Sequence, residues 1–158
     1  MNRLPYLLLI PLIVQVVWTS GASAFNTKRI PAGAGNPVPA ADITCFPNIW
    51  NGSVTNGCTS TKYWEVDIPT EGIDNQTGPS ATASVKAATA AGDIQCRFVT
   101  MSYDLTAFRF GSPVSNTLVG TAQVLSLSPY SGLAGGSAYF TCSVAPQGRL
   151  MNFTWNLW

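Results

Sequence analysis

The sequence of 158 residues contains no histidine, and only 9% of its residues are charged. Without histidine, the Ser-His-Asp and Cys-His forms of nucleophilic catalysis are excluded, and so are histidine-bound zinc sites. The eight basic and seven acidic side chains nearly cancel. Nucleic acid and anionic lipid bind clustered Lys and Arg, so we expect neither as a partner.

A long apolar run occurs only at the amino terminus. One basic residue, Arg3, precedes an apolar stretch at 4–18, and small residues follow at 22–24. This order is typical of a secretory signal peptide with an A-x-A cleavage site. The alternative, a membrane anchor, needs about 20 apolar residues, and two prolines and a glutamine interrupt this shorter run. We expect residues 1–24 to be removed, leaving a secreted, periplasmic or extracellular chain without a transmembrane segment.

The four cysteines lack the C-x-x-C spacing of a metal site, so we expect no metal and no cofactor. An even number of cysteines in an exported chain indicates disulfides, here with three possible connectivities. Two Asn-Gly pairs, at 51–52 and 56–57, predict tight turns with positive φ. A loop folded back in this way favours pairing Cys45 with Cys58.

Alternation of apolar and polar residues predicts short strands throughout the rest of the chain. In the segment 62–69, Tyr63, Glu65 and Asp67 share one side, and apolar residues share the other. Cys96 and Cys142 each fall on the apolar side of such a segment, so we expect them to face each other in the core and to form a disulfide. Similar segments lie at 94–104, 117–128, 138–146 and 149–158. At 81–93 the alanines favour a helix, but the alternation of Thr, Ser and Val favours a strand, and we expect a strand.

The expected fold is therefore all-β: a single antiparallel β-sandwich of about seven or eight strands, stapled by disulfides and spanning residues 42–158. Residues 25–41 contain three prolines and two glycines and show no apolar period. We expect them to form a flexible amino-terminal arm ahead of the domain.

Three short patterns carry a resemblance. They are Cys45-Phe46-Pro47, the I-x-C-x-F strand at 94–98 and the Y-F-x-C-x-V-x-P segment at 139–146. Over residues 42–158 the chain resembles a group of small, uncharacterised secreted bacterial proteins of β-sandwich fold, although Cys58 departs from their pattern. The resemblance implies export and a β-sandwich, and it implies no activity.

Candidate ligand-binding residues are Trp50, Tyr63, Glu65 and Asp67. Aromatic rings stack on the apolar faces of sugars, and Trp50 lies in a turn-rich loop beside asparagines. Glu65 and Asp67 project from one strand side, roughly 7 Å apart by strand geometry, which is a separation used by glycosidases. With a loop acid such as Asp74, the same pair could instead bind calcium.

These features support three hypotheses of function. The first is a secreted, non-catalytic module that recognises a glycan or a surface polymer through loop aromatics. The second is a self-associating matrix or fibre protein, since the strands carry few charged residues that would block edge pairing. The third is a small glycoside-active enzyme that uses Glu65 and Asp67.

Overall fold

The computed structural model describes residues 26–47, 51–69, 80–127 and 136–157. The predicted signal peptide therefore lies outside the described residues, and so do Trp50 and Asp74. No helix within the described part of the chain is long and apolar enough to cross a membrane.

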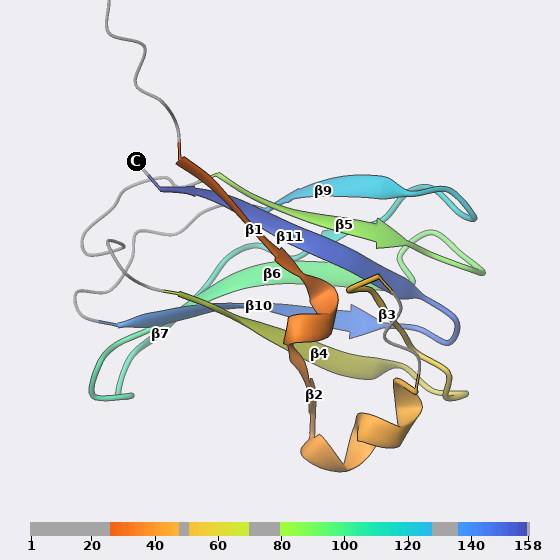
Figure 1. The fold of residues 1–158 in the computed structure, drawn as a ribbon, viewed down its shortest axis with the longest axis horizontal. Helices are drawn as coiled ribbons and strands as arrows, with labels where there is room; N and C mark the ends of the chain where they lie inside the picture. Colours follow the sequence, from red (N-terminus) through yellow and green to blue (C-terminus); the bar gives the residue numbers. More distant parts are fainter. Residues whose placement is uncertain (1–25, 48–50, 70–79, 128–135, 158) are drawn as a thin grey trace, which may run out of the picture.

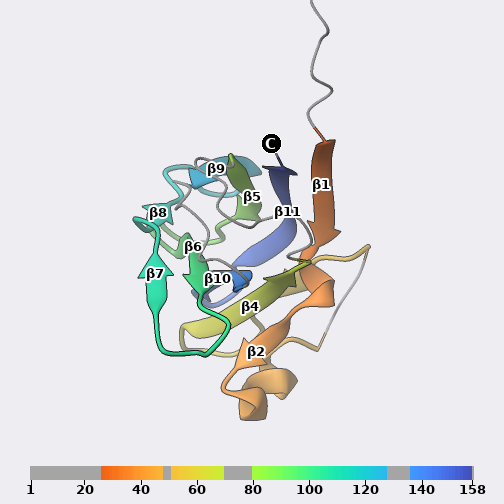
Figure 2. The same cartoon turned by 90° about the vertical axis from the view of Figure 1, so that its left-hand side faces the viewer.

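Two antiparallel sheets stack face to face, which confirms the predicted β-sandwich (Figure 1, Figure 2). The β11 sheet has the order β1 (Asn26–Pro31), β11 (Arg149–Leu157), β5 (Ala81–Lys86) and β9 (Gln123–Leu127), and β3 (Val54–Thr55) also pairs with β11. The β10 sheet has the order β2 (Asn36–Val38), β4 (Lys62–Ile68), β10 (Ser137–Val144), β6 (Ile94–Met101) and β7 (Phe108–Phe110), and β8 (Val114–Ser115) also pairs with β6.

Apolar side chains from the inner face of each sheet form one core between them. The alternation in β4 buries Trp64, Val66 and Ile68, as predicted. Phe140 of β10 stacks on Phe153 of β11, with ring centroids 4.7 Å apart, and so joins the two layers. Burial of such side chains is the main force that holds stacked sheets together.

A bulge in β11 decides which of its residues face the core. The sequence alternation left Leu150 and Met151 as rivals for the buried position. The pairing of β11 with β5 shifts by one residue between Leu150 and Asn152. Because a bulge adds one residue to a strand, both Leu150 and Phe153 are buried, while Met151 is only partly buried.

Cys96 and Cys142 form a disulfide, as predicted. They are directly paired residues on the neighbouring strands β6 and β10, and both are buried. The bridge therefore ties two strands of one sheet together. It does not join the two sheets, which are held by apolar packing.

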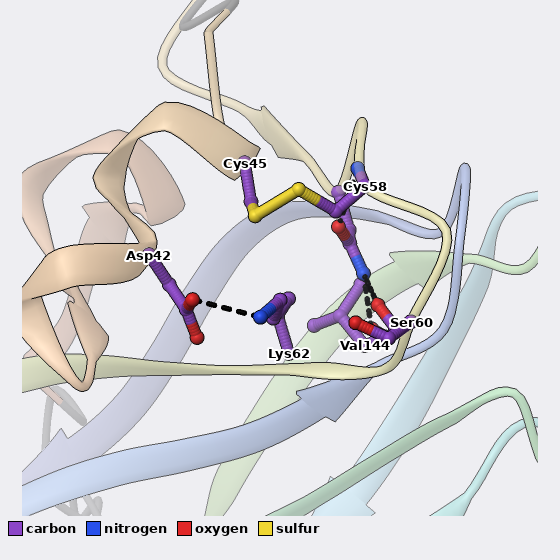
Figure 3. A network of polar contacts seen from close by, with 7 residues as sticks. Asp42, Cys45, Cys58, Ser60, Lys62 and Val144 are labelled. Carbon is purple, nitrogen blue, oxygen red and sulfur yellow. Dashed lines mark hydrogen bonds and ion pairs between the residues drawn. A yellow bond between two sulfur atoms is a disulfide. The ribbon is translucent and has the colours of Figure 1, made fainter.

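The second disulfide, Cys45 to Cys58, ties the short 3-10 helix η2 (Ala40–Cys45) to the chain just before β4 (Figure 3). An ion pair lies beside it, with Lys62 Nζ 2.7 Å from an oxygen of Asp42. The bridge confirms the predicted local pairing of Cys45 with Cys58.

Only one of the two Asn-Gly pairs forms the predicted turn. Asn51 and Gly52 have φ values of 51° and 73°. Asn56 is instead fully buried and donates its side-chain amide to the carbonyls of Ser60 and Val144. The amide thus fixes the loop inside the fold, a role that requires long-range partners and leaves no signal in the local sequence.

Residues 26–38, which we expected to belong to a flexible arm, form edge strands of both sheets. β1 pairs with β11, the 3-10 helix η1 (Ala32–Ala34) crosses from one layer to the other, and β2 pairs with β4. We call this segment the strap (Figure 2). Edge strands tolerate proline and contribute mainly backbone hydrogen bonds, so a strand of this kind needs no apolar period.

The strap is tied to the core where it crosses between the layers. Trp64 donates its indole N–H to the carbonyl of Ala32 at 2.8 Å. Gly35 lies so close to β4 that a Cβ there would be 2.0 Å from the carbonyl oxygen of Glu65. The described residues contain eleven strand segments, compared with the seven or eight predicted. The additional segments are the two strands of the strap and the short strands β3, β7 and β8.

Candidate functional site

The solvent side of the β10 sheet gathers polar and aromatic side chains from its three central strands. We call this surface face B. Register places Tyr63, Ser143 and Gln95 in one row across β4, β10 and β6. Face B as a whole consists of Tyr63, Glu65, Asp67, Gln95, Arg97, Tyr139, Thr141 and Ser143, together with Phe108 and Phe110 at its β7 edge.

A second row crosses the middle of face B. Glu65, Thr141 and Arg97 are directly paired across β4, β10 and β6. Directly opposed residues have Cβ atoms about 5 Å apart, so these side chains interact. An acid, a hydroxyl and a guanidinium are therefore held side by side on rigid strands.

A hollow of about 170 Å³ opens in face B. Its walls include Tyr63, Gln95, Arg97, Thr141 and Ser143. The hollow is smaller than the roughly 300–1,000 Å³ pockets that enclose drug-sized ligands, so it suits one unit of a chain that continues across the surface. Its lining includes neither Glu65 nor Asp67.

Aromatic rings stand exposed on face B. Tyr63 is 54% exposed, and Phe108 and Phe110 are 48% and 47% exposed. The two phenylalanine rings lie nearly parallel, with centroids 6.3 Å apart, and the Arg97 guanidinium carbon lies 4.8 Å from the Phe110 centroid. Exposing aromatic surface to water is unfavourable in free energy. These rings therefore indicate a surface at which the apolar face of a ligand can bind.

The charges on face B influence one another. Partial burial, followed by the negative charge of Asp67, raises the pKa of Glu65, while a hydrogen bond from Thr141 and the charge of Arg97 oppose the rise. Burial and the charge of Glu65 also raise the pKa of Tyr139. Arg97 therefore partly neutralises a pair of carboxylates that would otherwise repel each other.

The raised pKa of Glu65 makes a prediction about stability. Because the pKa of Glu65 is raised in the folded state, its contribution to the free energy of unfolding is most favourable at low pH. This contribution falls as the pH rises above about 4.3, the ordinary pKa of glutamate. We expect Glu65→Gln to raise the thermal midpoint relative to the native protein at pH 7 and to change it little at pH 3. Thermal melts followed by circular dichroism at both values would measure this.

Asp93 provides a control, because its pKa is shifted in the opposite direction from that of Glu65. Hydrogen bonds from Thr89 and Ala90 lower the pKa of Asp93, so its carboxylate stabilises the fold at neutral pH. Asp93→Asn should therefore lower the thermal midpoint at pH 7. An equal drop for Glu65→Gln at pH 7 would contradict the proposed cause.

Of the predicted site residues, the structure brings Tyr63, Glu65 and Asp67 together on face B. Trp50 lies outside the described residues, so its role stays a prediction. Arg97 and Thr141 were not among the predicted site residues, although alternation places both on the polar sides of their strands. Within the described ranges, no group of three His, Cys, Asp or Glu residues lies close enough to hold a metal ion. The calcium alternative also required a loop acid such as Asp74, and Asp74 lies outside the described residues.

Comparisons with known proteins give few matches. No protein-family model matches the sequence. A comparison with curated proteins likewise gives no significant match.

Among solved structures, the chain is similar to a "xylan-binding module CBM15", with 8% sequence identity and a TM-score of 0.47, covering 66% of this chain and 76% of that one. It is also similar to one of the "carbohydrate-binding modules from the beta-sandwich super family". The identity is 9%, the TM-score is 0.42, and the match covers 84% of this chain and 55% of that one.

Proposed function

We propose that the protein is a secreted, non-catalytic module that binds a neutral glycan on face B. The observation that carries the proposal is the exposed ring of Tyr63 at the hollow that Gln95, Arg97 and Thr141 also line. A sugar ring offers an apolar face to an aromatic side chain and hydroxyls to amides, guanidinium groups and hydroxyls. Face B supplies both kinds of partner within one short stretch of sheet.

The arrangement of face B favours a polymer over a small molecule. The hollow is small and open, and the exposed phenylalanine pair lies at the β7 edge of the same surface. A chain of sugars can contact Tyr63 and these rings in succession, gaining affinity from several weak contacts. The two further sequence hypotheses, self-association and catalysis by Glu65 and Asp67, stay predictions.

Tyr63→Ala tests the proposal. The wild-type protein is first titrated by calorimetry with soluble neutral β-glucan, xylan and galactomannan, and the variant is then titrated with each polymer that binds. We expect Tyr63→Ala to weaken binding by about tenfold or more, as for aromatic residues at binding hot spots. Because Tyr63 is 54% exposed, its removal should leave the fold intact.

Tyr103→Ala is the matched control. Tyr103 is 84% exposed and belongs to the turn between β6 and β7, away from the hollow. The same chemical change at this position should alter affinity by less than about twofold. Equal losses in the two variants, or no binding of the wild-type protein to any of the three polymers, would refute the proposal.

A further inference from the structure

The solvent side of the opposite sheet carries two neighbouring hollows that share one arginine. The first, of about 480 Å³, is lined by Arg29 of β1, Arg149 of β11, and Asn51, Ser53 and Asn152, among others. The second, of about 370 Å³, is lined by Arg149 and Lys86 of β5, among others. We call the two hollows together the cationic trough.

The side chains that line the trough carry positive charge, and no acidic side chain in the lining balances it. Arg29, Lys86 and Arg149 contribute three cations, and neither hollow has a carboxylate in its lining. Across the described ranges the single ion pair joins Lys62 and Asp42, so none of the three cations is paired there with an acid. Three of the eight basic residues of a chain with formal net charge +1 thus share one surface.

Two of these cations are placed where they repel each other. Arg149 and Lys86 are directly paired across β11 and β5. Their neighbours Leu150 and Val85 are both buried, so the two charged side chains share the solvent side. Like charges directly opposite each other destabilise a sheet, and a bound anion would relieve this repulsion.

The guanidinium of Arg149 is held in position by a buried hydroxyl. Ser53 is 4% exposed, and its Oγ accepts hydrogen bonds from Nε and Nη2 of Arg149 at 2.8 and 2.6 Å. An arginine carries five N–H donors, so Ser53 leaves the other three for a ligand. A fixed guanidinium loses little freedom when it binds an anion, and its planar donor pairs match carboxylate and sulfate oxygens.

From these observations we infer a second binding site, independent of face B, in which the cationic trough binds anionic groups of an acidic polysaccharide. Two hollows that share Arg149 suit two successive charged groups of one chain. Asn51 and Asn152 line the first hollow, and Gln147 and Thr55 the second, and these side chains can hydrogen-bond sugar hydroxyls. Nucleic acid fits less well, because its binding commonly uses about six to ten phosphate contacts, and the trough supplies three cations.

The test is titration of the whole mature protein with polygalacturonate, dextran sulfate and uncharged dextran. The first two polymers distinguish carboxylate from sulfate as the preferred group. We expect binding to at least one of them at about 20 mM salt, weaker binding at about 200 mM, and none to dextran. Arg29→Gln, Lys86→Gln and Arg149→Gln should each weaken binding by about tenfold, the typical effect of losing a charge-assisted hydrogen bond.

Lys28→Gln is the matched control. Lys28 adjoins Arg29 in β1, and because side chains alternate along a strand it points to the other side. The Lys28→Gln substitution changes the net charge by the same amount as the three test substitutions. It should change the affinity for the polyanion by less than about twofold. Arg149→Lys keeps the positive charge but loses the planar pairs of N–H donors. The affinity of this variant for the polyanion should therefore fall between those of the native protein and Arg149→Gln.

Oligothymidine is titrated as a nucleic-acid probe. Four outcomes would overturn the inference: no binding to either polyanion at low salt, equal binding to dextran, an equal loss for Lys28→Gln, or tighter binding to oligothymidine than to the better polyanion. Arg29→Gln and Lys86→Gln alter exposed side chains, so the test does not depend on the folding of the Arg149 variants. Tyr63→Ala should leave polyanion binding unchanged, which separates failure of this inference from failure of the proposal for face B.

Discussion

Replacing Cys96 and Cys142 together with alanine is expected to lower the free energy of unfolding by about 4 kcal/mol. The bridge closes a loop of 46 residues, and the chain-entropy model assigns a contribution of about that size to such a loop. Typical domains are stable by only about 5–15 kcal/mol, so the variant should unfold at a much lower urea concentration. Equilibrium urea unfolding followed by tryptophan fluorescence would measure the change.

The other disulfide provides the comparison. Cys45 and Cys58 close a loop of 13 residues, so replacing both with alanine should cost less, about 3 kcal/mol. Titration with a thiol reagent should find no free thiol in the native protein. Four titratable thiols in the folded chain, or an unchanged urea midpoint for Cys96→Ala with Cys142→Ala, would show that the bridges do not stabilise this fold.

Gly35→Ala is expected to destabilise the protein by about 3 kcal/mol or more. The added methyl group would lie 2.0 Å from the backbone oxygen of Glu65, 2.6 Å from Val66 Cγ2 and 2.7 Å from the indole nitrogen of Trp64. Backbone cannot move aside as a flexible side chain can, so the cost should reach or exceed the usual overpacking penalty of about 1–3 kcal/mol. Urea unfolding of the variant would measure it.

A second measurement locates the damage in the strap. If the clash at Gly35 lifts the strap from both sheets, trypsin should cleave after Lys28 or Arg29 in β1 faster than in the native protein, because edge pairing with β11 is weakened. Gly57→Ala is the control, since its nearest heavy atoms lie at 3.5 Å. Similar losses of stability in the two variants would contradict the steric explanation.

Side-chain alternation predicted the central strands well because burial acts on every second residue. Trp64, Val66 and Ile68 appear in the sequence at the same spacing at which they enter the core. The pairing of Cys96 with Cys142 followed from the same rule, since both were placed on buried sides. The strap was missed because it joins the sheets at their edges through its backbone, and backbone pairing leaves no apolar period.

The candidate site was predicted only in part. Alternation placed Tyr63, Glu65 and Asp67 on the solvent-exposed side of one strand. It placed Arg97 and Thr141 on the solvent-exposed sides of two others. It could not show that these three strands are neighbours. Phe108 and Phe110 lie in a three-residue strand, too short for an alternation signal.

The sequence alone determined that this chain folds as an all-β sandwich with two disulfides, because the alternation of apolar residues and the positions of the cysteines are local properties. The tertiary structure alone decided the strand order β4-β10-β6, which assembles face B, and the pairing of β11 with β1 and β5, which assembles the cationic trough. The physical reason is that backbone hydrogen bonds pair strands without regard to side-chain identity. Packing of the whole core selects the neighbours, and with them the residues that meet on each surface.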